Sequence, residues 1–154
     1  MTDITNLSTV NVAISNYIAV VTMNNPPVNA QNRQFHDDLT LAFDVLSDRN
    51  DVRSIVLTGA GKCFSAGADI KGRASQESDL GDHWVHSRRV RECFYSIMEC
   101  RKPVIAAING AALGAGLAVA ASADILIASE SASVGLPEIN VGLLGGGRHA
   151  MRLF

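Results

Sequence analysis

The sequence predicts an α/β fold with a parallel sheet at its centre. Three observations support this class: short apolar segments lie between turn signals, segments with helical periodicity separate them, and no linker, low-complexity run or exact repeat interrupts the 154 residues. Strands that alternate with helices are usually joined by right-handed crossovers, which place them in a parallel sheet buried on both faces. We therefore expect residues 1–154 to form a single domain.

The first predicted elements are a hairpin and a helix. Val10–Ser15 and Ile18–Met23 are rich in β-branched residues and are separated by only two residues, which favours two paired strands. Pro26 and Pro27 exclude a strand interior and a helix interior, so the next element begins near Gln31. Apolar and acidic residues then alternate with helical spacing and predict an amphipathic helix: the apolar ones are Phe35, Leu39, Ala42, Phe43 and Leu46, and the acidic ones are Asp37, Asp38, Asp44 and Asp48.

The second half of the chain alternates strands and helices. Ser54–Gly59 is a short apolar segment and predicts a strand. A second helix follows, which Pro103 closes before a strand over Val104–Ile108; its apolar face comprises Val90, Cys93, Phe94, Ile97 and Met98. We then expect a helix of small residues from about Leu113 to Ser122, a strand over residues 124–129 and a turn at Pro137.

Residues 104–123 also permit a different interpretation. They carry no charge over about the length of a membrane helix, and Gly110 and Gly114 form a G-x-x-x-G spacing. The segment is nevertheless built from alanine and glycine more than from leucine or phenylalanine, and Asn109 with Gly110 is a turn signal. This composition favours a strand, a turn and a helix, with a small membrane protein as the alternative hypothesis.

The composition excludes several classes of partner. A formal net charge of −2 and an aromatic content of 5% give no basic stripe with stacking rings, so nucleic acid is not expected as a partner. Cys63, Cys93 and Cys100 are odd in number and lack paired spacing, which is typical of free thiols in a reducing compartment. The N-terminal residues lack the features of a secretion signal. We therefore expect a cytoplasmic protein.

The sequence does not match the P-loop, dinucleotide-binding or α/β-hydrolase motifs at all of their required positions. Cys63 stands where a P-loop requires Ser or Thr, and Val119 occupies the third small position of a dinucleotide-binding turn. An α/β-hydrolase would need glycine in place of Cys63, before Ser65. His83 and His86 could share one face of a helix, and we expect that face to be solvated and not to bind a metal.

The remaining chemistry is that of the backbone. Two bends of small residues, 65–69 and 109–116, follow predicted strands and would present free N–H groups. Amides that converge on one point stabilise an oxygen that gains negative charge, as in a thioester enolate. The alternative, which composition alone favours, is that Gly67, Ala68, Gly114 and Ala115 form only tight turns and helix packing.

Four ordered motifs resemble a known family. They are NPPVNA (residues 25–30), SAGADIK (65–71), INGAALGAGLAVAASAD (108–124) and GLPEINVGLLGGG (135–147). Together they are similar to the signatures of the crotonase, or enoyl-CoA hydratase/isomerase, superfamily. The resemblance implies a crotonase-like (ClpP/crotonase) spiral of ββα units that binds coenzyme A thioesters, with an oxyanion hole for the thioester oxygen. Coenzyme A would be part of the substrate, so no separate cofactor is expected.

The resemblance assigns roles to residues. The two amide donors of the oxyanion hole would be Ala68 and Ala115, the latter usually glycine in the family, and Glu138 would be the general acid and base. The loop from Ala66 to Lys71 would line the coenzyme A moiety. The expected substrate-binding residues are Ala66, Ala68, Asp69, Ile70, Lys71, Ala115 and Gly116.

Ala118 departs from the family pattern. Hydratases of this superfamily carry a second glutamate at that position. Hydration needs one group that positions and deprotonates the water while the α-carbon receives a proton, and a single carboxylate does both poorly. A single glutamate suits a proton shuttle through an enolate, so an enoyl-CoA isomerase is at least as well supported as a hydratase. Hydrolase and dehalogenase branches also tolerate change here. Either reading implies an enzyme of fatty acid metabolism.

The end of the sequence is the second departure. Residues 145–154, GGGRHAMRLF, resemble the start of a helix, and family members continue into helices that complete the acyl pocket and the trimer. We therefore expect a crotonase-like core domain without those C-terminal helices, forming a homotrimer or hexamer if that part is supplied. The alternative function is a truncated, non-catalytic domain that binds acyl-CoA or associates with other subunits.

Overall fold

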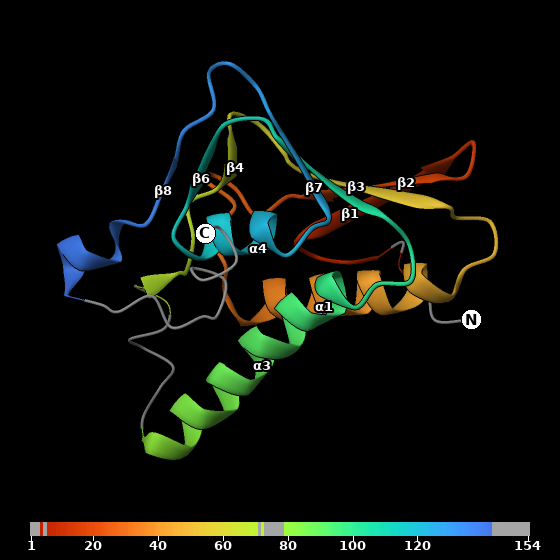
Figure 1. The fold of residues 1–154 in the computed structure, drawn as a ribbon. Coiled ribbons are helices and arrows are strands. Elements are labelled where there is room, and N and C mark those ends of the chain that lie inside the picture. Colours follow the sequence, from red (N-terminus) through yellow and green to blue (C-terminus); the bar gives the residue numbers. More distant parts are fainter. Residues whose placement is uncertain (1–3, 5, 71, 73–78, 143–154) are drawn as a thin grey trace.

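Two sheets and a layer of helices make up the computed structural model, which describes residues 4, 6–70, 72 and 79–142. Helices α1 and α3 lie along one side of the larger sheet, and the shorter strands stand at its end (Figure 1). The elements in order are β1 (Val10–Ser15), β2 (Ile18–Met23), α1 (Arg33–Asp48), β3 (Ser54–Gly59), β4 (Cys63–Ser65), α3 (Leu80–Met98), β5 (Val104–Ile108), β6 (Ala111–Leu113), α4 (Ala115–Ala121), β7 (Ile125–Ala128), β8 (Val134–Gly135) and a 3-10 helix, η1 (Pro137–Val141).

The larger sheet confirms the strands predicted in the first two thirds of the chain. Its order is β1-β2-β3-β5-β7, with β1 and β2 antiparallel and the other neighbours parallel. β1, β2, β3 and β5 begin and end where the sequence predicts. The side chains that alternate inward along them, such as Val21, Leu57 and Ala106, are fully buried and form the core with α1.

The smaller sheet was not predicted. Its order is β4-β6-β8, all parallel, and its strands are only two or three residues long. The expected helix from about Leu113 is wrong at its start, because Leu113 pairs with Gly135 in the sheet and α4 begins at Ala115. Gly114 separates the two elements with φ +54 and ψ −122, a conformation that favours glycine and cannot continue a helix. This small sheet positions the two glycine-containing bends.

Helix α1 has the predicted apolar face, with one correction on its acidic face. The side chain of Asn32 caps the helix by accepting a hydrogen bond from the Phe35 N–H. Asp38 is 4% exposed and does not face solvent. Its Oδ2 accepts hydrogen bonds from the backbone N–H groups of Ser8 and Thr9, at 2.9 and 2.8 Å, and from Thr9 Oγ1. A carboxylate can be buried here because these donors replace water, and it fastens the chain before β1 to α1.

His36 makes the stability of this fold sensitive to acid. Burial, and to a smaller extent the positive charges of His86 and Arg89, lower the pKa of His36 from 6.5 to about 4. The unfolded chain therefore binds this proton at a higher pH than the folded chain. The free energy of unfolding is therefore highest, as far as His36 determines it, above pH 6.5, and it decreases as the pH falls from 6.5 toward 4.

We expect His36 to reduce the free energy of unfolding by roughly 2 to 3 kcal/mol between about pH 7.5 and about pH 4.5. Urea unfolding at the two pH values measures this difference. The variant His36→Gln should lose most of the pH dependence that His36 causes, and His83→Gln, at an exposed position of α3, should keep it. Equal pH dependence in His36→Gln and the parent chain would contradict the prediction.

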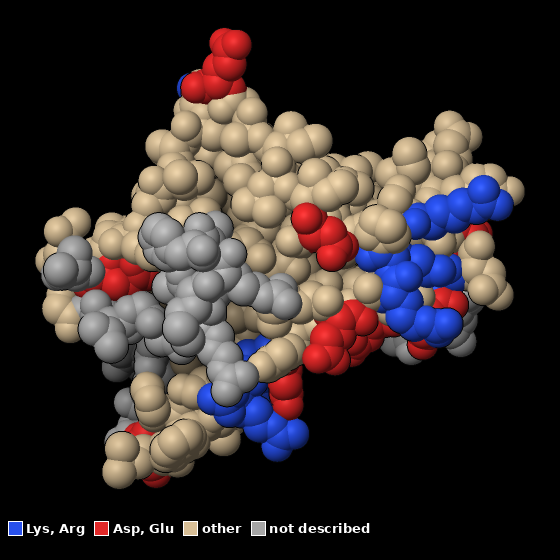
Figure 2. Space-filling view, viewed as in Figure 1, with Lys and Arg blue, Asp and Glu red and all other residues tan. Residues whose placement is uncertain are grey.

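Strand β7 departs from the expectation of a sheet buried on both faces. All four of its residues are exposed, including Ile125 at 51% and Ile127 at 60%, and Val134 of β8 and Leu136, which follows β8, are exposed as well. In Figure 2, charged side chains gather over the lower and right parts of the molecule, whereas the upper part is largely uncharged below its acidic tip. The edge of the larger sheet formed by β7 is therefore an apolar surface.

Residues 104–123 do not form the membrane helix that was considered. They are divided into β5, β6 and the seven-residue α4. Across the described residues, no helix is long and apolar enough to cross a bilayer.

All three cysteines are free, and burial raises the pKa of Cys93 to about 12.

Candidate functional site

The first of the two bends lies after β4 and is held by Gln31, two residues before α1. The Gln31 N–H donates to the Gly67 carbonyl at 2.8 Å, and the Asp69 N–H donates to the Gln31 carbonyl at 3.1 Å. In such a parallel bridge the residues on either side of Ala68 make the ladder bonds, so the N–H of Ala68 points to the opposite edge. This N–H donates no hydrogen bond to any residue that the structure describes.

The second bend joins β6 to α4. The Gly114 N–H donates to the Gly135 carbonyl at 2.8 Å and so completes the pairing of β6 with β8. Ala115 is the first residue of α4 and has no intrahelical acceptor for its N–H. Within the described ranges, the Ala115 N–H also has no acceptor outside the helix.

The two bends touch each other. A Cβ atom placed on Gly67 would lie 2.6 Å from the Leu113 carbonyl oxygen and 3.2 Å from the Ala115 nitrogen. Gly116 is buried and packs against the backbone carbonyl of Ser65 so closely that a Cβ atom would overlap it. Gly67 and Gly116 thus allow a close approach of two backbone segments that are distant in the sequence.

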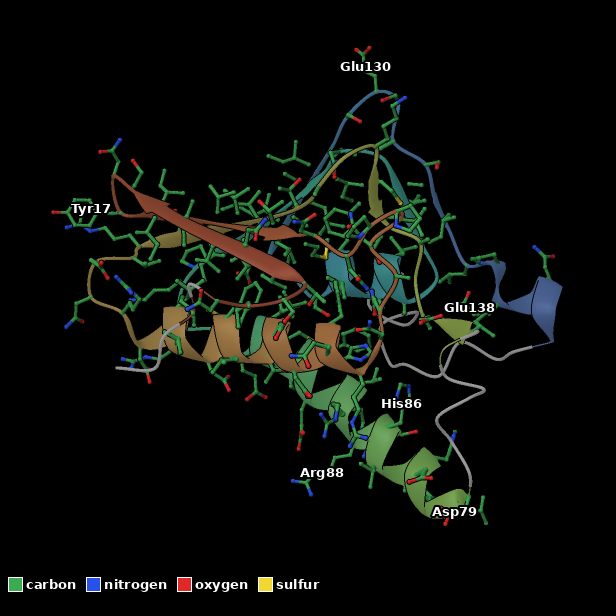
Figure 3. All side chains as sticks on the ribbon, turned by 180° about the vertical axis from the view of Figure 1, so that it is seen from behind. Tyr17, Asp79, His86, Arg88, Glu130 and Glu138 are labelled. Carbon is green, nitrogen blue, oxygen red and sulfur yellow. The ribbon has the colours of Figure 1, made fainter. Side chains whose placement is uncertain are left out.

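Glu138 lies against the second bend. It is the second residue of η1, and its Oε1 would lie 2.8 Å from a Cβ atom placed on Gly114. Its Oε2 is buried and has no hydrogen-bond partner in the described part of the chain. Figure 3 shows the Glu138 side chain beside η1, far from the exposed loop tip that carries Glu130. The structure therefore brings Glu138 next to the residue that precedes Ala115.

The other predicted site residues lie in the first bend or directly after it. Ala66 is half-buried, and its N–H is bonded to the segment before α1. Asp69 Oδ1 accepts a hydrogen bond from the Gly72 N–H at 2.9 Å, and the side chain of Ile70 is 51% exposed. Lys71 lies outside the described residues. Ala118, on the inner face of α4, is 1% exposed.

Sequence reasoning missed the polar residues that hold the first bend. Asn29 Nδ2 donates to the backbone carbonyls of Ala60, Cys63 and Phe64, at 3.0, 2.8 and 3.3 Å. Ser65 Oγ donates to the Asn29 carbonyl at 2.7 Å and accepts from Gln31 Nε2 at 3.3 Å. Asn29 belongs to the first motif, but nothing in the sequence pattern indicates that it contacts β4.

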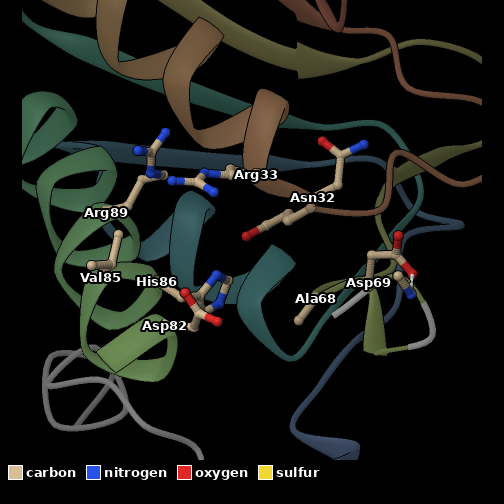
Figure 4. Close-up of a pocket in the computed structure, with 10 residues that line it drawn as sticks. Asn32, Arg33, Ala68, Asp69, Asp82, Val85, His86 and Arg89 are labelled. Carbon is tan, nitrogen blue, oxygen red and sulfur yellow. Dashed lines mark hydrogen bonds between the residues drawn. The ribbon is translucent and has the colours of Figure 1, made fainter. Parts of the chain in front are cut away.

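A small cavity lies beside Ala68. It encloses about 50 Å³ between the start of α1 and the first half of α3. Figure 4 shows Ala68 on one side of this cavity and His86 and Arg89 on the other. Among the described residues, no group of three or more His, Cys, Asp or Glu side chains is placed to hold a metal ion. Residues that line the cavity include Gln31, Arg33, Asp69 and Asp82.

The sequence matches a family of known proteins. The model of the family described as enoyl-CoA hydratase/isomerase matches residues 13–153. The chain is 39% identical over 147 residues to a probable enoyl-CoA hydratase of Bacillus subtilis (strain 168), an alignment that covers 96% of this chain and 57% of that protein. It is also 38% identical over 137 residues to the (7aS)-7a-methyl-1,5-dioxo-2,3,5,6,7,7a-hexahydro-1H-indene-carboxyl-CoA hydrolase of Mycobacterium tuberculosis (strain ATCC 25618 / H37Rv), covering 88% of this chain and 55% of that protein.

The fold is similar to that of a solved structure. The crystal structure of an enoyl-CoA hydratase/carnithine racemase from Magnetospirillum magneticum matches with a TM-score of 0.90 and 27% sequence identity. The match covers 96% of this chain and 56% of that chain. The present chain thus spans a little over half the length of the proteins it matches.

Proposed function

This chain belongs to the enoyl-CoA hydratase/isomerase family, and from that premise we propose that it acts on an acyl-CoA thioester through an enolate. The predicted crotonase-like α/β fold is confirmed by the solved structure it resembles. The observation that carries the proposal is the Glu138 carboxylate packed against Gly114, next to an Ala115 N–H without an acceptor in the described ranges. A buried, unpartnered Glu138 Oε2 is suited to receive a proton from bound substrate.

In the proposed reaction, the N–H groups of Ala68 and Ala115 donate hydrogen bonds to the thioester oxygen. Glu138 removes a proton from carbon 2 of a 3-enoyl-CoA, and the electron pair moves into the thioester to form an enolate. Glu138 then returns the proton to carbon 4, which leaves a 2-enoyl-CoA. One oxyanion donor contributes about 3 kcal/mol or more of transition-state stabilisation, and a positioned base contributes about 100- to 10,000-fold in rate.

Ala118 supports isomerisation over hydration as the proposed reaction. The resemblance places a second glutamate of the hydratases at this position, and the methyl group of Ala118 can neither position nor deprotonate water. Glu138 alone can move one proton between two carbons of the same substrate. We therefore propose an isomerase of the acyl-CoA esters of fatty acid metabolism, with hydration as the slower reaction.

Incubation of the chain with 3-hexenoyl-CoA in heavy water tests this proposal. We expect 2-hexenoyl-CoA whose carbon 4 mostly carries the protium that Glu138 took from carbon 2, detected by mass spectrometry, and slower hydration of added 2-hexenoyl-CoA. Faster hydration than isomerisation would contradict the isomerase assignment within the family. Binding of the thioester with neither reaction would instead support the alternative, a non-catalytic domain that binds acyl-CoA.

We further propose that the chain functions in an assembly, with a trimer or hexamer expected if the C-terminal part is supplied. The exposed apolar side chains of β7 and of residues 134–136 support this, because such a surface favours contact with another protein surface. Sedimentation velocity measures the mass of the particle. A monomer at all concentrations would contradict the proposal.

A further inference from the structure

Ser65 lies between the two bends and contacts both of them. It is the last residue of β4 and is fully buried. On one side its Oγ accepts a hydrogen bond from the Gly67 N–H at 3.3 Å, inside the first bend. On the other side it packs against Gly116, so closely that a Cβ atom placed on Gly116 would lie 2.9 Å from the Cβ atom of Ser65. Gly67 and Gly116 are the chain neighbours of the two proposed oxyanion donors, so Ser65 links the segments that carry them.

The hydroxyl group of Ser65 uses its full hydrogen-bonding capacity. A hydroxyl group has one proton to donate and two lone pairs that accept. Ser65 Oγ donates to the Asn29 carbonyl at 2.7 Å. It accepts from Gln31 Nε2 and from the Gly67 N–H, both at 3.3 Å. Asn29 and Gln31 are each 2% exposed, so removal of the hydroxyl group would leave buried polar groups unpaired.

The direction of the Ala68 N–H depends on the peptide group between Gly67 and Ala68. In a trans peptide group the carbonyl and the N–H point in opposite directions. The Gly67 carbonyl accepts from the Gln31 N–H at 2.8 Å, so the Ala68 N–H points away from Gln31. Gly67 has φ +92, and glycine tolerates many backbone conformations, so the chain can turn here unless it is held on both sides. Gln31 holds the peptide group after Gly67, and Ser65 Oγ holds the N–H before it.

Regular secondary structure holds the second bend. The Gly114 carbonyl accepts from the Ala118 N–H at 3.1 Å in the first turn of α4, so the Ala115 N–H of the same peptide group points out of the helix start. The Gly114 N–H is bonded to the Gly135 carbonyl of β8. The first bend, in contrast, consists of alanine and glycine, whose side chains are too small to anchor it by packing.

We propose that Ser65 is a positioning residue of the oxyanion hole. Its hydroxyl group fixes the Gly67 N–H and thereby the direction of the Ala68 N–H relative to the start of α4. The inference rests on the proposed function, because Ser65 has this role only if the two N–H groups bind the thioester oxygen. Ser65 is fully buried, so it acts on the reaction through Ala68.

Ser65→Ala removes the hydroxyl group and keeps the backbone bonds of the bend. We expect the turnover of 3-hexenoyl-CoA to fall about tenfold. This is less than the roughly 100-fold effect of a full 1 Å displacement, because the N–H groups of Ala66 and Asp69 remain bonded to residues 28 and 31. The dissociation constant for hexanoyl-CoA should change by less than about threefold, since the donors act mainly on charge that develops in the transition state. Steady-state kinetics and calorimetry measure the two quantities.

Infrared spectroscopy of bound hexanoyl-CoA, isotope-labelled at the thioester carbonyl, reports on the donors directly. A carbonyl group that accepts hydrogen bonds vibrates at a lower frequency, so binding to the parent chain should lower this frequency. In Ser65→Ala about half of the shift should be lost, since one of the two donors is displaced. A residue that contributed only to folding would leave the shift unchanged in the folded variant. The measurement does not depend on which reaction follows.

Ser122→Ala is the matched control. Ser122 is also a buried serine, 3% exposed, and its Oγ donates to the Ala118 carbonyl at 2.9 Å at the end of α4. The substitution removes a buried hydroxyl group that is bonded to neither bend in the described part of the chain. We expect it to reduce the free energy of unfolding, measured in urea, and to leave turnover and the carbonyl shift unchanged.

Ser65→Cys is a second variant of the same position. A thiol is a weaker donor and acceptor than a hydroxyl group, so both turnover and the carbonyl shift should lie between those of the parent chain and Ser65→Ala. If urea unfolding shows that Ser65→Ala is not folded, the same two measurements on Ser65→Cys decide. Parent values in folded Ser65→Cys would then overturn the inference.

The outcomes separate this inference from the proposed function. If hexanoyl-CoA does not bind to the parent chain, or binds without a lower carbonyl frequency, the proposed oxyanion hole fails and this inference fails with it. If the parent chain shows the shift and folded Ser65→Ala keeps both the shift and the turnover, only this inference is overturned. Equal losses in Ser65→Ala and Ser122→Ala would show a general effect of stability and would overturn it as well.

Discussion

Replacing Glu138 with glutamine is expected to lower the turnover of 3-hexenoyl-CoA about 1,000-fold, since the amide cannot accept and return the proton. The substitution preserves the shape of the side chain that lies against Gly114. The dissociation constant for hexanoyl-CoA should therefore change by less than about threefold. Steady-state kinetics and calorimetry measure the two quantities.

Glu130→Gln is the control for this substitution. Glu130 stands on the exposed loop tip between β7 and β8, away from Glu138, so the loss of its charge should leave turnover unchanged (Figure 3). Undiminished turnover by Glu138→Gln would show that another group moves the proton. An equal loss in both variants would indicate an effect of net charge.

Replacing Gly67 with alanine is expected to lower turnover about 100- to 1,000-fold, the size of effect that loss of an oxyanion donor produces. The new Cβ atom would lie 2.6 Å from the Leu113 carbonyl oxygen and 3.2 Å from the Ala115 nitrogen, so the two bends must move apart. The amides of Ala68 and Ala115 would then no longer converge on one oxygen. Turnover and the free energy of unfolding are measured together.

Gly61→Ala separates this contact from backbone strain. Gly61 also has a positive φ, +73 against +92 for Gly67, but a Cβ atom there has nothing within 4 Å. Both substitutions place alanine in a left-handed conformation, which costs about 1 kcal/mol, and Gly67→Ala should be destabilised further by its contact with the Leu113 carbonyl. Only Gly67→Ala should also lose turnover, and equal activity of the two folded variants would exclude the proposed meeting of the bends.

The sequence predicted the elements whose periodicity is long enough to be recognised. β1, β2, β3 and β5 have the expected bounds, and α1 and α3 cover the segments where helices were expected. The three strands of the smaller sheet were missed because each is two or three residues long, which is too short for an alternating pattern. The burial of Asp38 was missed because its partners come from the segment before β1.

The candidate site was predicted from family resemblance and could not be predicted from composition. Composition alone favoured tight turns and packing at Gly67 and Gly114, and the structure does show close packing at both. The positions of Ala68, Ala115 and Glu138 as site residues came from four ordered motifs. Gln31 and Arg89 carry no motif, and only the structure places both of them on the cavity beside Ala68.

By itself the sequence determined the α/β class and the order of its main elements, because a strand or helix with a buried face has apolar residues at regular spacing. It also determined the family, because each motif is a contiguous stretch of residues. Tertiary structure alone decided that Glu138 lies against Gly114, that Gly67 touches the start of α4 and that Gln31 and Arg89 line one cavity. These arrangements depend on pairing between very short strands and on the absence of a Cβ atom where two backbone segments meet. Such contacts join residues far apart in the chain, so they leave no periodic signal in the sequence.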